Sequence, residues 1–144
     1  MKISDILVTK GKTVFTIRPD QSLRDAIQML DAHNIGGLVV MEDQKIVGII
    51  SERDIIRFAA TDNPDFSAWV QIVMTKNVIV GSLQDDLHAV AHTMTEKRFR
   101  HLPIVEKGEL VGIITIGDVL KAQRDSYKGQ VYTLQTIVTA GDST

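Results

Sequence analysis

The chain has 144 residues, a formal net charge of −2 and no cysteine. This length suits one domain with a single core and excludes two large domains. The charge argues against a nucleic-acid partner, which selects for a basic face, and the lack of cysteine excludes disulfides, thiolate catalysis and cysteine-bound metals.

The opening residues MKISDILVTKGK contain no apolar signal region. No stretch approaches the ~20 apolar residues that a membrane span needs. We therefore expect a soluble, cytoplasmic protein with no membrane partner.

An internal repeat dominates the sequence, because residues 14–57 align with residues 78–121 without a gap. Identical pairs include Gly48 with Gly112 and Asp54 with Asp118. Internal repeats define the architecture before any other signal.

Each repeat predicts the same elements in chain order. A short strand (VFTI or VIV) comes first, and apolar residues at helical spacing from Leu23 or Leu87 predict a helix. A β-rich run, a turn, a second strand and a second helix opening near Asp54 or Asp118 follow. The prediction is an α/β (α+β) fold of two pseudo-symmetric β-α-β-β-α units, each too small to bury its own sheet and therefore packed against the other.

The predicted boundaries are residues 1–61 for the first repeat, 62–77 for a linker, 78–123 for the second repeat and 124–144 for a C-terminal helix or tail. Within the linker, Phe66, Trp69, Val70 and Val73 predict an amphipathic helix laid along the core. In the tail, the apolar residues at helical spacing are Val131, Leu134, Ile137 and Val138.

The repeated motif is Gly-x-x-[Ser/Thr]-x-x-Asp, at Gly48–Asp54 and Gly112–Asp118. One interpretation is a capping box, in which the hydroxyl and the carboxylate satisfy free N–H groups of the first helical turn. The other is ligand binding. Aspartate is shorter than the glutamate that capping boxes favour, so we expect its carboxylate to face outward and bind a ribose diol. The glycine and two isoleucines would line a slot for a purine. The two interpretations need not exclude each other.

With both motifs in register, and with the segments MTKNV and RFRHLPIVEKGELVGIITIGDVLK, the chain resembles a stand-alone, bacterial-type pair of CBS domains, named from cystathionine β-synthase. The resemblance implies a Bateman module with two clefts for adenosine-containing ligands, usually paired as a homodimer. Carried over from the family, the first cleft would be formed by Ile50, Ser51, Arg53, Asp54, Lys76, Val78 and the segment 98–103, in which Arg98, Arg100, His101 and Pro103 are named. The second would be formed by Ile114, Thr115, Asp118, Lys12, Val14 and the segment 35–38, in which Ile35, Gly36 and Gly37 are named.

The two clefts differ in charge. The first has several candidate cations and should prefer a phosphorylated ligand. Around Asp118, glycines replace Arg53, Arg100 and His101, and Lys12 is the one evident cation. We expect a weaker, less charged or bulkier ligand there, or none.

The leading functional hypothesis is a sensor that binds an adenine nucleotide, with AMP first and ADP, ATP or NAD(H) as alternatives, and that regulates an unidentified protein in trans. The alternative is a structural or interaction protein whose clefts are vestigial. We expect no enzymatic activity, because neither Ser51 nor Thr115 has a histidine at a matching position to act as a base. His88 and His92 have metal-ligand spacing, but no third ligand is evident, so a solvated face is expected.

Overall fold

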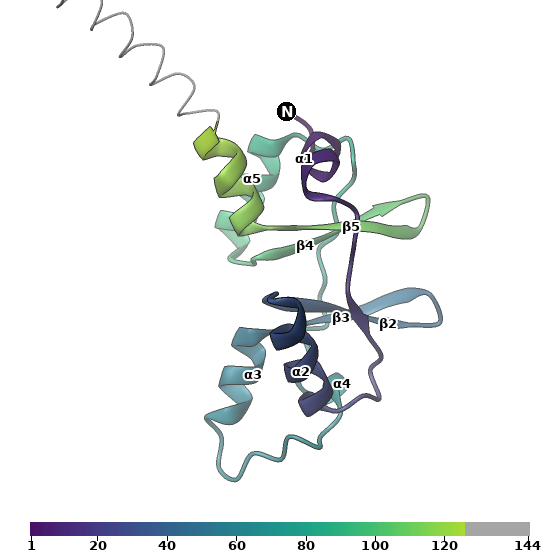
Figure 1. The fold of residues 1–144 in the computed structure, drawn as a ribbon, viewed down its shortest axis with the longest axis vertical. Helices are drawn as coiled ribbons and strands as arrows, with labels where there is room; N and C mark the ends of the chain where they lie inside the picture. The colour runs from purple at the N-terminus through teal and green to yellow at the C-terminus, as the bar shows by residue number, and fades with distance from the viewer. Residues whose placement is uncertain (126–144) are drawn as a thin grey trace, which may run out of the picture.

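The computed structural model describes residues 1–125. Figure 1 shows two similar halves whose small sheets lie in the middle of the molecule, with the helices on the outside. The apolar residues of the predicted tail lie outside the described residues. Within residues 1–125, the structure contains no helix long and apolar enough to cross a membrane.

The predicted order of elements is confirmed in the first half. It consists of β1 (Thr16–Ile17), α2 (Leu23–His33), β2 (Gly37–Glu42), β3 (Lys45–Ser51) and α3 (Glu52–Ala59). Strand β1 pairs with β2 in parallel, and β2 pairs with β3 antiparallel.

The second half follows the same plan with α5 (Leu87–Lys97), β4 (His101–Glu106), β5 (Glu109–Thr115) and a helix that begins at residue 116. The predicted VIV strand is absent as a strand, and a single parallel bridge from Gly81 to Ile104 stands in its place. The two hairpins share one register: Leu38 faces Ile50 in one, and Leu102 faces Ile114 in the other.

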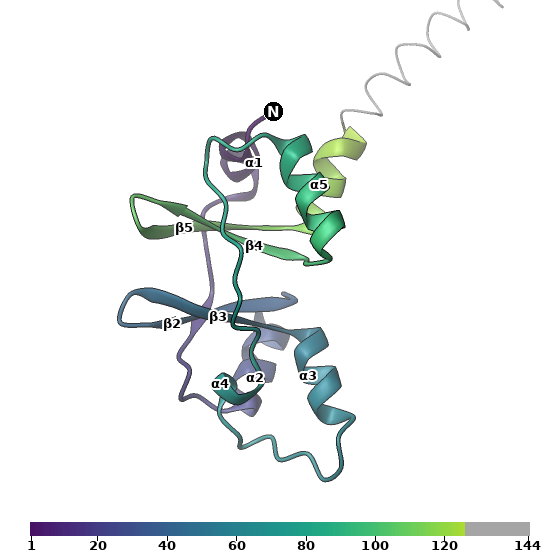
Figure 2. The same cartoon turned by 180° about the vertical axis from the view of Figure 1, so that it is seen from behind.

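Each half is completed by a helix that comes from elsewhere in the chain. Helix α1 (Ile3–Lys10), which the sequence analysis did not predict, buries Ile3, Ile6 and Leu7 in the core of the second half. The linker helix α4 (Val70–Val73) buries Val70 in the core of the first half. The connecting segments cross between the halves on opposite sides, residues 11–15 nearer the viewer in Figure 1 and residues 74–82 in Figure 2.

Helix α4 is shorter than the predicted linker helix. Residues 66–68 before it form a turn, and their carbonyl groups accept hydrogen bonds from the first turn of α2: Leu23 N donates to Ala68 O, and Arg24 N to Phe66 O. These amides have no partner inside their own helix. Phe66 packs against the first core as expected, but Trp69 is 51% exposed, so its assignment to the core was wrong.

The glycines of the repeated motif have a structural role. A Cβ atom on Gly48 would lie 2.5 Å from Sδ of Met74, and one on Gly112 would lie 2.8 Å from Cδ1 of Leu7. Met74, which follows α4, and Leu7 of α1 therefore fill the space beside these glycines that the sequence analysis assigned to a purine.

Candidate functional site

Both strand-to-helix turns form capping boxes. At α3, Ser51 N donates to Oδ2 of Asp54 over 2.9 Å, and Asp54 N donates to Oγ of Ser51 over 3.3 Å. At the helix that begins at residue 116, Thr115 N donates to Oδ2 of Asp118 over 2.8 Å, and Asp118 N donates to Oγ1 of Thr115 over 3.2 Å. We expected the shorter aspartate to leave its carboxylate facing outward, but in both turns Oδ2 accepts a hydrogen bond from the N-cap amide.

The second oxygen of Asp54 faces the linker. Oγ1 of Thr75 donates to Oδ1 of Asp54 over 3.2 Å. A hydroxyl is a neutral and rotatable donor that can also turn away. The capping bonds hold the carboxylate in place through Oδ2. Because the Thr75 hydroxyl can rotate away, Oδ1 can still accept a hydrogen bond from another donor.

An open cleft of about 780 Å³ lies beside Asp54. Its walls come from β3 and α3 of the first half and from residues 77–79 and 97–101 of the second half. This volume lies within the ~300–1,000 Å³ range of small-molecule sites. The cleft is lined by Ile49, Ser51, Glu52, Arg53, Asp54, Ile56, Arg57, Thr75, Asn77, Val78, Ile79, Lys97, Arg98, Phe99, Arg100 and His101.

The structure brings together most of the residues predicted for this cleft. The predicted residues on its walls are Ser51, Arg53, Asp54, Val78, Arg98, Arg100 and His101. Ile50 is wholly buried in the first core, because alternate strand residues face opposite sides and its neighbour Ile49 faces the cleft. Pro103 is buried within β4, and Lys76 is exposed away from the cleft walls.

The cleft is strongly basic. Its cationic side chains are Arg53, Arg57, Lys97, Arg98 and Arg100. Against them stand two carboxylates, Glu52 and Asp54. Arg57 was not predicted, although it lies four residues after Arg53 and therefore on the same face of α3. Such a surplus of cations suits an anionic ligand.

His101 also lines the cleft. Burial lowers the pKa of its imidazole below the usual value of 6.5, and the carboxylate of Glu52 partly opposes this effect. Lys10 and Arg100 lower the pKa further, while Asp54 raises it. The neutral imidazole is therefore favoured in the folded protein.

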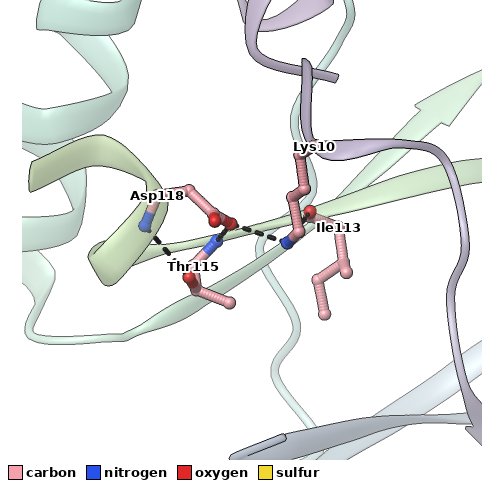
Figure 3. Close-up of polar contacts among 4 residues, drawn as sticks. All are labelled: Lys10, Ile113, Thr115 and Asp118. Atoms are coloured by element: carbon pink, nitrogen blue, oxygen red, sulfur yellow. Dashed lines mark hydrogen bonds and ion pairs between the residues drawn. The ribbon is translucent and has the colours of Figure 1, made fainter. Parts of the chain in front are cut away.

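The second turn has a different occupant. Nζ of Lys10 donates to Oδ2 of Asp118 over 2.6 Å and to the carbonyl oxygen of Ile113 over 2.7 Å (Figure 3). Burial acts to raise the pKa of Asp118, but the hydrogen bonds from Lys10 and Thr115 and the charge of Lys10 outweigh it and leave the pKa below 3.8. Lys12, the predicted cation, is exposed.

The other residues predicted for the second cleft are only partly accessible. Ile114 is wholly buried in the second core, and Gly37 is buried against His101. Val14, Ile35 and Gly36 are half-buried. Phe15, which follows Val14, stacks on His33 with the ring centroids 3.7 Å apart.

The predicted solvated histidine face agrees with the structure. His92 lies 4.0 Å from the carboxylate of Glu96, and both side chains are exposed. Within residues 1–125, no three His, Cys, Asp or Glu side chains cluster so that they could hold a metal ion.

The repeated architecture and its turns define a pair of CBS domains. The chain belongs to this family, because the CBS domain model matches residues 3–61 and again residues 70–125. It is 39% identical to a CBS-domain-containing protein of Agrobacterium tumefaciens, whose crystal structure superposes with a TM-score of 0.82 over 85% of this chain and 99% of that one. The family predicted from the sequence is confirmed.

Two further similar structures contain ligands. A CBS domain protein from Pyrobaculum aerophilum, complexed with AMP, is 25% identical, with a TM-score of 0.73 over 82% of this chain and 89% of that one. A CBS domain pair complexed with 5′-methylthioadenosine and S-adenosylmethionine is 27% identical, with a TM-score of 0.78 over 88% of this chain and 98% of that one. The chain thus shares its fold with CBS domain proteins whose structures contain adenosine-containing ligands.

Proposed function

We propose that this protein is a sensor that binds an adenine nucleotide in the cleft beside Asp54 and regulates a partner protein in trans. The observation that carries the proposal is the composition of that cleft, in which the fixed carboxylate of Asp54 and that of Glu52 share the walls with five cationic side chains. AMP, ADP, ATP and NAD(H) each combine the neutral diol and the phosphate that these groups suit.

Each part of a nucleotide has a complementary wall. The carboxylate of Asp54 would accept hydrogen bonds from the ribose diol, as acidic residues do in dinucleotide-binding folds. Arg53, Arg98 and Arg100 would bind phosphate, assisted by the amino-terminal end of α3. Four of the apolar lining residues, Ile49, Val78, Ile79 and Phe99, would contact the base.

The cleft would couple binding to a change in the whole module, because its walls come from both halves. A ligand that binds better to one arrangement of the halves shifts the population toward that arrangement. A partner that recognises one arrangement would then respond to the nucleotide. The same proposal gives the protein a binding role without catalysis.

We also propose that a second copy of the chain covers the exposed helices. Ile56 on α3 and Leu120 on the helix that begins at residue 116 occupy equivalent repeat positions and are 66% and 57% exposed. Equivalent apolar residues on both halves would form a self-complementary surface. Native mass spectrometry should show a dimer, and replacing both residues with glutamate should give a monomer.

The competing function is that of a scaffold with vestigial clefts, and the complete capping boxes at Asp54 and Asp118 favour it. Thermal unfolding with AMP, ADP, ATP and NAD(H) separates the two. A ligand at 100 times its Kd should stabilise the protein by about 2.7 kcal/mol. If no nucleotide changes the Tm, the sensor proposal fails.

A matched pair of variants separates capping from binding. Asp25 closes the same capping box in α2, with Ser22 N donating to Oδ2 of Asp25 over 3.3 Å, and it lies outside the cleft. Asp25→Ala and Asp54→Ala should each cost about 0.5–2 kcal/mol of stability. Only Asp54→Ala should abolish the nucleotide-induced shift, and an equal response in both variants would contradict ribose binding by Asp54.

A further inference from the structure

The two repeated turns differ in the donor that reaches their aspartate. At Asp54 the donor is the hydroxyl of Thr75, which follows α4. At Asp118 the donor is the ammonium of Lys10, the last residue of α1. In both halves the donor comes from the end of the added helix or from the residues just after it. Only in the second half does that donor carry a charge.

Lys10 is held firmly at the second turn. Its ammonium bonds both Asp118 and the carbonyl of Ile113, and the side chains of Lys10 and Asp118 are only 28% and 22% exposed. Figure 3 shows the lysine reaching down from α1 to the mouth of the turn. Charge-assisted hydrogen bonds are about twice as strong as neutral ones. A ribose hydroxyl would therefore have to displace a stronger donor.

Among the described residues, Lys121 at the position equivalent to Arg57 keeps a cation near the second turn, but two other cations of the first cleft have no counterpart there. Arg53 and Arg100 of the first cleft correspond to Gly117 and Gly36, so the cations that would attract a phosphate are missing at these positions. Ile79 and Lys97 line the first cleft, whereas their equivalents Phe15 and His33 stack on each other. At these two positions the second half therefore has a stacked pair of rings where the first cleft has an isoleucine and a lysine.

We propose that Lys10 is an internal occupant that closes the second turn to nucleotides, so that each chain binds one nucleotide and not two. The inference rests on the proposed function of the first cleft. Lys10 would then set the number of nucleotides that each chain binds. Removing its ammonium opens a second site at Asp118.

The test is isothermal titration calorimetry with ATP and, separately, with adenosine. Lys10→Met keeps the length and the apolar stem of the side chain but loses the charge, and Lys45→Met removes an exposed lysine at the start of β3 as a control. The wild type and Lys45→Met should bind one ATP per chain, and Lys10→Met should bind two. The second site, lacking the arginines, should bind ATP and adenosine with similar affinity.

Two further measurements locate the new site and separate the two proposals. In amide NMR spectra, the Thr115 and Gly117 signals should shift with ATP in Lys10→Met and stay unchanged in the wild type. Asp54→Ala combined with Lys10→Met should bind one ATP at the second turn. Two ATP molecules per wild-type chain, or one ATP per chain in both the wild type and Lys10→Met, would overturn the role of Lys10. A wild type that binds none while the double variant binds one would refute the proposed function and retain the role of Lys10.

Discussion

The imidazole of His101 lies so close to Gly37 that a Cβ atom on Gly37 would be 2.9 Å from both Cδ2 and Nε2 of the ring. These residues begin β4 and β2 and occupy equivalent repeat positions. The two halves can approach here because one carries a ring and the other carries only a hydrogen atom.

Gly37→Ala should therefore force the ring of His101 out of place. Overpacking of this kind costs about 1–3 kcal/mol of stability, which chemical denaturation can measure. Gly117→Ala is the matched control, because a Cβ atom there would meet its nearest neighbour at 3.6 Å. Adding His101→Ala should recover part of the stability lost in Gly37→Ala, and a Gly37→Ala protein as stable as the wild type would contradict the close packing.

His101 should also make stability depend on pH. Burial lowers its pKa below 6.5, so the unfolded chain binds a proton more readily than the folded one. The stabilisation is complete above about pH 6.5 and is lost as the pH falls through the folded-state pKa. His101→Gln should flatten the dependence of the free energy of unfolding between pH 7 and pH 5, while exposed His88→Gln should leave it unchanged. Equal slopes in both variants would assign the effect to other groups.

Replacing Arg98 should weaken nucleotide binding without lowering the stability of the fold. It ends α5 in the left-handed conformation, with φ of 56°, and Asn34 ends α2 at the equivalent position with φ of 51°. Asparagine tolerates this conformation well, so Arg98→Asn should keep or slightly raise the Tm. Loss of one charge-assisted bond should weaken ATP binding about tenfold, equivalent to ~1.4 kcal/mol, and affect adenosine little.

Lys107→Asn is the control for this charge change. Lys107 is also left-handed, with φ of 52°, but it lies in the turn between β4 and β5, outside the cleft. It should leave the affinity for ATP unchanged in calorimetry. Similar losses in both variants would mean that net charge, and not the position of Arg98, governs affinity.

The ion pair between Lys10 and Asp118 should appear in a double-mutant cycle. Lys10→Met, Asp118→Asn and their combination should give a coupling of about 1 kcal/mol, because the pair is partly buried and hydrogen-bonded. Because the pKa of Asp118 is lowered, its contribution is full above about pH 3.8 and is lost as the pH falls through the folded-state value. Lys10→Met should reduce this acid sensitivity, and additive single effects would argue against the pair.

The repeat could be predicted from the sequence because its signals are local. Helical spacing from Leu23 and Leu87 and the gapless alignment identify the elements that the structure contains. The two hairpins keep the same register because the same apolar alternation fixes both of them.

Helix α1 and the contact of Lys10 with Asp118 could not be predicted in this way. The partners of Leu7 and Lys10 lie more than a hundred residues further along the chain, at Gly112 and Asp118. The turn before α4 likewise depends on its hydrogen bonds to α2. For the first cleft, the motif indicated Asp54 and the family resemblance indicated the arginines, but the positions of Ile50 and Pro103 required the direction of each strand residue.

The packing of α1 on the second half also constrains how the protein is made. Residues 3–10 leave the ribosome long before Ile114 and Val119, which belong to the same core cluster. During synthesis the first half can fold with α4 in its core. The apolar face of α1 stays exposed until its packing partners in the second half have been synthesised. Helix α1, which also carries Lys10, can therefore pack into its core only late in synthesis.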